Sequence, residues 1–231
     1  MGKSQSGRTM LEKDPNLDDL IDYISNQKQD KNPQEIQSKY LRLTEERNAL
    51  DYLEKAYDYI RQVEKDEWAW KWVILALHSA LYGFAICASM GSSSDWVAPV
   101  IKKGKNKGQR QLISIGKALE FCQNPSWMKI YVHSKHLTLS KQQEESIDKL
   151  KNWFRDEFEH YKPVRWSIEL HGMPQICIDV LEVIRFLALE TGNCIHLTQT
   201  QIKKIGYIVT YGKRMLERSQ LYKEFKQEEN N

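Results

Sequence analysis

Apolar residues recur at steps of three or four along most of the chain, which is the spacing of one buried helical face. This pattern predicts helices over residues 33–65, 68–90, 112–123, 140–162, 173–189 and 198–225, with an open alternative of a break near Thr44. Clusters of Gly, Pro, Asn and Ser mark the turns between them. Only residues 164–170 alternate apolar and polar side chains, which predicts a brief extended segment. The sequence therefore predicts an all-α fold.

The most apolar stretch is WAWKWVILALHSALYGFAICASM, residues 68–90. A membrane span needs about 20 apolar residues, and here Lys71 and His78 interrupt the run. We therefore expect a core helix that is buried nearly all round, with a membrane-associated helix as the alternative. His78 has two interpretations: a core histidine that is hydrogen-bonded to a partner, or a site residue that a neighbouring helix brings close to His160.

These patterns predict that the chain has three segments. Residues 1–32 are polar and contain Pro15, so we expect a flexible N-terminal extension with one short amphipathic helix over residues 17–24. We expect residues 33–225 to form a single helical domain and residues 226–231 to form a frayed tail. The last helix begins with a capping box from Thr198 to Gln201. It carries an inner apolar stripe and a basic outer side, formed by Lys203, Lys204, Lys213, Arg214 and Arg218.

Composition excludes some classes and leaves others open. With 231 residues, 41% of them hydrophobic, the chain can bury a core of good size. A net charge of +3 is not diagnostic of nucleic-acid binding. The four cysteines lie far apart with no C-x-x-C pair, which indicates a reducing cytoplasm and no structural zinc. His133 and His136 have no carboxylate or thiol near them in sequence, so we expect an exposed loop there, no metal and no cofactor.

Basic residues gather in one Gly-containing segment, IKKGKNKGQR, residues 101–110. Such a run can bind RNA phosphates and release their counterions. A charged run can equally be a solvated loop, and both interpretations stay open here. The candidate RNA-binding residues are Lys102, Lys103, Lys105, Lys107 and Arg110.

The helix predicted from residue 140 opens with a capping box, Ser140 to Gln143, and ends before Pro163. In a regular α-helix, at about 100° per residue, Arg155 would lie to one side of the apolar face and His160 to the other. Asp156 precedes His160 by four residues, so the two side chains would be neighbours.

These three residues suit RNA cleavage. Histidine transfers protons near neutral pH, and arginine offers a permanently charged fork to phosphate oxygens. Asp156 would orient the imidazole of His160 and favour its protonated form. The alternative is a surface ion pair between Arg155 and Glu159, which would contribute only about 0.3–0.5 kcal/mol. One Arg and one His are too few for the whole reaction, and a symmetric dimer would bring two of each to one cleft.

The run RDEFEH, residues 155–160, resembles the signature of the HEPN superfamily: Arg, a polar residue, three further residues and His, late in a helix. The resemblance covers residues 41–189. It implies a HEPN-like helical bundle, with the N-terminal extension and the last helix outside it. It also implies a metal-independent endoribonuclease whose composite site forms across a homodimer, with RNA as substrate.

The family includes cytoplasmic toxins and antiphage defence effectors, so an antitoxin or a defence partner protein is also implied. It includes non-catalytic members as well, and a helical binding or dimerisation module is therefore the alternative function. A related subgroup carries a Tyr, modified by a nucleotidyltransferase antitoxin, two positions after the His. Here that position is Lys162, and Tyr161 fits the apolar stripe. This departure argues against control by nucleotide transfer.

Overall fold

The computed structural model describes residues 41–91, 93–154 and 167–229. The chain divides into Met1–Arg42 and Leu43–Asn231, and every described helix belongs to the second unit. The described residues form helices and loops without a strand, which confirms the all-α prediction. The elements are α2 (Glu45–Ile60), α3 (Ala69–Met90), η1 (Ser94–Trp96), α4 (Ile115–Gln123), α5 (Pro125–Met128), α6 (Lys141–Lys149), η2 (Leu150–Phe154), α8 (Met173–Arg185), η3 (Phe186–Glu190), α9 (Gln199–Arg218) and α10 (Gln220–Glu229).

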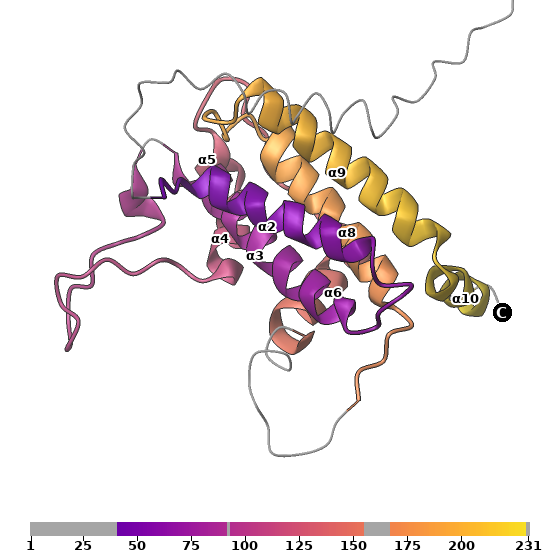
Figure 1. Cartoon of the computed structure of the whole chain (residues 1–231). Helices are drawn as coiled ribbons and strands as arrows, with labels where there is room; N and C mark the ends of the chain where they lie inside the picture. Colours follow the sequence, from indigo (N-terminus) through magenta and orange to yellow (C-terminus); the bar gives the residue numbers. More distant parts are fainter. Residues whose placement is uncertain (1–40, 92, 155–166, 230–231) are drawn as a thin grey trace, which may run out of the picture. The chain divides into compact units, whose positions relative to one another are not determined.

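Helix α3 is the centre of the core, and α2, α4 and α8 pack against it (Figure 1). Trp70 and Phe84, near its two ends, are both almost completely buried. Its closest neighbour is α2, because Gly83 of α3 faces Ala49 of α2. A Cβ added at Gly83 would lie 2.7 Å from the Cβ of Ala49. The absence of a side chain at Gly83 therefore permits the two helices to approach this closely.

Helix α3 is also the one described helix that is long and apolar enough to cross a membrane, and 67% of its most apolar window is buried inside the protein. Burial against other helices of the same chain is the pattern of a core helix in a water-soluble protein. The structure thus favours the core-helix interpretation over the membrane-associated one.

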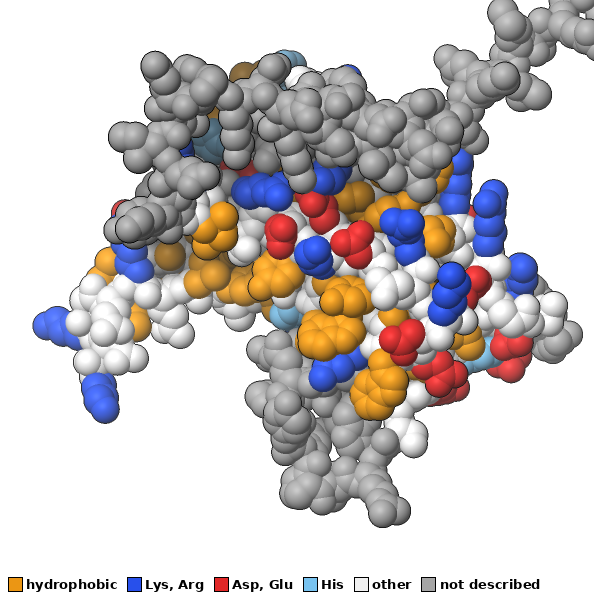
Figure 2. Space-filling model, in the orientation of Figure 1, with side chains coloured by type: hydrophobic (Ala, Val, Ile, Leu, Met, Phe, Trp, Pro, Cys, Tyr) orange, Lys and Arg blue, Asp and Glu red, His pale blue; other side chains and the backbone are white. Residues whose placement is uncertain are grey.

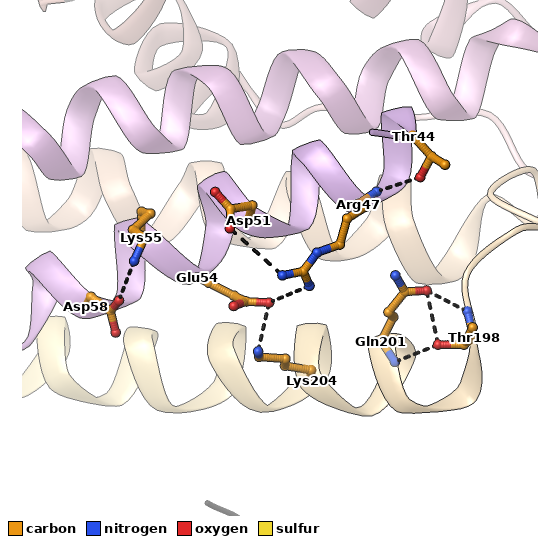
Figure 3. A network of polar contacts seen from close by, with 9 residues as sticks. All are labelled: Thr44, Arg47, Asp51, Glu54, Lys55, Asp58, Thr198, Gln201 and Lys204. Atoms are coloured by element: carbon orange, nitrogen blue, oxygen red, sulfur yellow. Dashed lines mark hydrogen bonds and ion pairs between the residues drawn. The ribbon is translucent and has the colours of Figure 1, made fainter. Parts of the chain in front are cut away.

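Helices α8 and α9 lie side by side, and α9 also contacts α2 (Figure 1). The α9 stripe that faces inward includes Ile205, Val209 and Leu216, as the periodicity predicted. The prediction of a basic outer side is wrong in part, because two of its lysines form ion pairs with neighbouring helices. Lys204 pairs with Glu54 of α2 at 2.8 Å (Figure 3), and Lys213 pairs with Glu182 of α8.

Side-chain caps set several helix ends. The predicted box at Thr198 is present: its Oγ1 accepts from Gln201 N at 3.3 Å, and Gln201 Oε1 accepts from Thr198 N at 2.8 Å (Figure 3). Thr44 Oγ1 accepts from Arg47 N at 3.2 Å, so α2 begins at Glu45 and residues 41–44 are not helical. The prediction of one continuous helix over residues 33–65 is therefore wrong at residues 41–44. The alternative prediction, a break near Thr44, is confirmed.

Other boundaries of the helices also differ from those predicted. The helix expected from residue 112 begins at Ile115, because Ser114 caps it. Residues 167–170 are neither helix nor strand, so they form an irregular connection to α8. Residues 226–229, expected to be frayed, belong to α10, where the ammonium of Lys226 lies 5.3 Å from the ring centre of Phe225. The expected N-terminal extension and its short helix lie outside the described residues.

The Gly83–Ala49 contact gives a test of the α2–α3 packing. Gly83→Ala should lower the free energy of unfolding by about 1–3 kcal/mol, because overpacking outweighs the better helix propensity of alanine. Gly206→Ala is the matched control, since it lies within α9 and an added Cβ meets nothing within 4 Å. That substitution should raise stability by about 0.5–1 kcal/mol. Urea unfolding followed by circular dichroism measures both.

The double variant Ala49→Gly, Gly83→Ala removes the clashing methyl group and should recover part of the loss. Equal effects at positions 83 and 206 would show that α2 and α3 do not approach this closely.

Candidate functional site

The predicted catalytic residues Arg155, Asp156 and His160 lie outside the described residues, as do Glu159 and Tyr161. The structure describes the helix that leads to them. In α6 the predicted capping box is present, because Ser140 Oγ accepts from Gln143 N at 3.2 Å and Gln143 Oε1 accepts from Ser140 N at 3.1 Å. The start of the segment that carries the candidate motif is thus fixed by local hydrogen bonds.

A buried carboxylate joins α6 to α8. Asp179 is only 4% exposed. It accepts hydrogen bonds from Ser146 Oγ at 2.6 Å and from Gln175 Nε2 at 2.9 Å. Gln142 Nε2 donates to both carboxylate oxygens at 3.1 Å. A buried carboxylate needs such donors, and two of the three come from α6, so they fix the position of α6 on α8.

Sequence reasoning missed this cluster. Asp179 stands within the apolar run of α8, and Ser146 lies beside Ile147 on the buried face of α6. The available signal was a carboxylate at a buried helical position, which is rare unless it has partners. Its two partners on α6 are 33 and 37 positions away in sequence, so periodicity alone does not identify them.

After Lys149 the helix changes form. Residues Leu150–Phe154 are π-helical, with hydrogen bonds that span five residues instead of four. The expected unbroken α-helix from residue 140 is therefore wrong over residues 150–154. The regular rotation of 100° per residue therefore does not apply through residues 150–154, and the directions predicted for Arg155 and His160 lie outside the described residues. Leu150 remains fully buried, and η2 contacts α3.

The candidate His78 lies in the middle of α3, where it is half-buried. It takes part in an interaction with another group. Its half-buried position in the core helix agrees with a histidine held by a partner. Proximity to His160 stays a prediction, because residue 160 is outside the described chain.

The basic segment forms a hairpin-shaped loop that extends away from the helices (Figure 1). Ile101 N donates to Gln109 O at 2.8 Å, and Gly108 N donates to Ile101 O at 2.9 Å. Gly104 and Gly108 have φ of +88° and +87°, a conformation that non-glycine residues adopt at a cost. The loop is therefore an ordered turn supported by backbone hydrogen bonds, which we call the lysine hairpin (residues 97–113).

The charges on the lysine hairpin divide into two groups. Lys102, Lys103, Lys105 and Lys107 are exposed, and none of them forms an ion pair within the described chain. Basic side chains project at the outer end of the hairpin in Figure 2. Arg110, in contrast, pairs with Asp95 and donates to Ala98 O at 3.4 Å. The four lysines are thus available to phosphates, whereas Arg110 stabilises the stem. Among the five predicted RNA-binding residues, Arg110 therefore has the least structural support.

The cysteines give no reactive centre. All four are free, and burial raises the pKa of each thiol, to about 12 for Cys122. A thiol with so high a pKa is not a nucleophile near neutral pH. In the part of the chain that the structure describes, no three His, Cys, Asp or Glu side chains form a group that could hold a metal ion. His133 and His136 are exposed in a loop, as predicted.

Comparison with protein-family models, with curated proteins and with solved structures finds no match to this chain. The interpretation of residues 155–160 as a HEPN motif therefore stays a prediction from the sequence.

Loss of the buried carboxylate should destabilise the fold. Asp179→Ala leaves three donors without an acceptor, and we expect a loss of about 2–4 kcal/mol in the free energy of unfolding. Asp179→Asn keeps the shape and one acceptor oxygen, so its loss should be smaller. Urea unfolding ranks the two variants. If Asp179→Ala costs less than Asp179→Asn, the carboxylate does not hold the contact between α6 and α8.

Proposed function

We propose that this protein is a metal-independent endoribonuclease of HEPN type, which acts as a homodimer. The observation that carries the proposal is the run RDEFEH at residues 155–160. Support comes from its context in the chain: the run comes after a capped helix, which a buried hydrogen-bond network holds against α8, and after the π segment that continues that helix. A catalytic site needs a rigid support, since small displacements of reacting groups lower the rate, and α6 is the described element that would provide it.

The reaction is an internal transfer at phosphorus. The 2′-hydroxyl oxygen attacks the adjacent phosphorus while a base takes its proton, and the bond from phosphorus to the 5′-oxygen breaks. An acid protonates the leaving 5′-oxygen, so the products are a 2′,3′-cyclic phosphate and a 5′-hydroxyl. His160 transfers protons in this scheme, Arg155 binds the charged phosphate oxygens, and Asp156 orients His160.

Two copies of the chain supply enough proton-transferring groups for the reaction. Separate base and acid functions need two proton-transferring groups, and the motif holds one histidine. A two-fold axis beside the motif brings His160 and Arg155 of both subunits to one cleft. The homodimer is therefore part of the proposal.

The setting follows from the same resemblance. We propose a cytoplasmic toxin or antiphage defence effector, held inactive by an antitoxin or controlled by a defence partner protein. The four cysteines are free, and three of them are buried, which agrees with a reducing compartment. The exposed lysines of the hairpin are the part of the described surface best suited to bind RNA phosphates.

Cleavage assays test the catalytic residues. Labelled single-stranded RNA is incubated in EDTA with the full chain and with the variants Arg155→Ala and His160→Ala. Each variant should lose about 100-fold or more in rate, because each removes a positioned catalytic group. Glu159→Gln is the matched control from the same run, and it should retain activity because Glu159 has no role in the scheme. Unfolding curves establish that all variants fold.

Undiminished cleavage by both Ala variants would reject these assignments. A stable dimer by light scattering that cleaves no RNA would instead support the non-catalytic binding or dimerisation module.

A further inference from the structure

An aromatic pocket lies beside the stem of the lysine hairpin. It has a volume of about 450 Å³ and is lined in part by Trp96, Trp127, Asn124, Ser126 and Lys129. That volume falls within the range of small-ligand sites. The lining combines flat aromatic rings with hydroxyl, amide and ammonium groups, which is the chemistry that recognises a nucleobase.

The two tryptophans are held in fixed positions. One face of Trp127 stacks on Phe121, with ring centres 3.8 Å apart and planes at 15°. Its Nε1 donates to Ser89 O at 3.0 Å. Trp96 contacts Trp127 edge to face, with ring centres 4.9 Å apart and planes at 79°. Trp96 is nevertheless 56% exposed, so its ring is supported from one side and open to a stacking partner.

The polar groups of the pocket keep free donors. Asn124 Oδ1 accepts from Ser126 N at 2.9 Å and from Trp127 N at 3.2 Å. Its Nδ2 forms no hydrogen bond within residues 41–229 as far as the structure describes them. Lys129 is exposed at the rim. An amide donor and an ammonium group beside an open indole ring suit the carbonyl of a base and its phosphate.

The pocket is connected to the lysines through the stem. Asp95, next to Trp96, pairs with Arg110, and Ile113 N donates to Val97 O at 2.8 Å. From Trp96 to Lys102 is a chain of six residues, which spans at most about 20 Å. One strand of nucleic acid can therefore reach both the pocket and the hairpin lysines.

We propose that this pocket binds a nucleobase of single-stranded RNA by stacking on Trp96, while the hairpin lysines bind phosphates of the same strand. The proposal rests on the proposed function, for which it names a substrate-binding subsite. A duplex is excluded as the ligand because its bases are stacked on one another and offer no free face. A stacking ring together with nearby basic side chains is typical of proteins that bind single strands.

Exposed aromatic residues elsewhere provide the control. Trp68, at the start of α3, is 75% exposed. Asp66 lies close to it, since its carboxylate accepts from the backbone N–H of Trp68 at 2.9 Å. Asp66 forms no ion pair within the described chain, whereas Asp95 beside Trp96 is paired with Arg110. The unpaired negative charge near Trp68 repels phosphates, so Trp68 should not contribute to RNA binding.

Fluorescence anisotropy tests the pocket with two probes: a fluorescein-labelled 12-nucleotide oligo(A), and an abasic oligomer of the same length and charge. All proteins carry His160→Ala and are assayed in EDTA, so the RNA stays intact. Trp96→Leu should weaken oligo(A) binding about tenfold and leave the abasic oligomer unchanged. Trp68→Leu should change neither. Replacement of the four hairpin lysines by alanine should weaken both probes and flatten the salt dependence.

The proposal would be overturned if Trp96→Leu weakened the binding of the two probes equally. It would also be overturned if Trp96→Leu and Trp68→Leu had the same effect on oligo(A) binding. Wild-type cleavage is scored separately. Binding of oligo(A) that depends on Trp96 in a protein without cleavage would support the pocket and reject the nuclease. RNA cleavage by a protein whose oligo(A) binding does not depend on Trp96 would support the nuclease and reject the pocket.

Discussion

The close approach of α2 to α3 is the constraint on which the described unit depends. It requires glycine at position 83, because any side chain there would meet Ala49. With α2 in place, α3 has one face covered and offers its other faces to α4 and α8. Helix α3 can be apolar almost all round for this reason. The same burial explains why a segment with the composition of a membrane span has the environment of a core helix.

A second, polar constraint acts at the helix that leads to the candidate motif. Asp179 is buried with donors from α6 and α8, so sliding or rotating α6 would deprive the carboxylate of its two donors on α6, Gln142 and Ser146. Apolar packing tolerates many arrangements of similar volume, whereas hydrogen bonds to a buried charge tolerate few. The position of α6 on α8 is therefore defined up to Lys149, where the π segment begins. The candidate residues Arg155 and His160 lie beyond the part of the chain that the structure describes.

Local signals in the sequence were sufficient for most of the helical segments and for two of their capped ends. The boxes at Ser140 and Thr198 join residues three apart, and both are present. Non-local features were not predictable in the same way. The π segment Leu150–Phe154 has no sequence signature of its own and interrupts an unbroken apolar period. The pairing of Arg110 with Asp95 depends on a loop that brings residues 15 positions apart together.

The candidate site was predictable in part. The exposure of the hairpin lysines agrees with their sequence, since glycines and polar residues separate them. The pocket at Trp96 was missed, because its walls come from η1, α3 and α5, and its aromatic contacts join positions far apart in sequence. The roles of Arg155, Asp156 and His160 stay predictions from sequence.

Attack by the 2′-hydroxyl is the central chemical claim, and product analysis tests it most directly. An RNA oligonucleotide and its all-2′-deoxy counterpart are incubated with the full chain in EDTA, and mass spectrometry identifies the ends. The account predicts RNA fragments with 2′,3′-cyclic phosphate and 5′-hydroxyl ends, and an intact deoxy strand. Cleavage of the deoxy strand, or RNA fragments with 5′-phosphate ends, would contradict it.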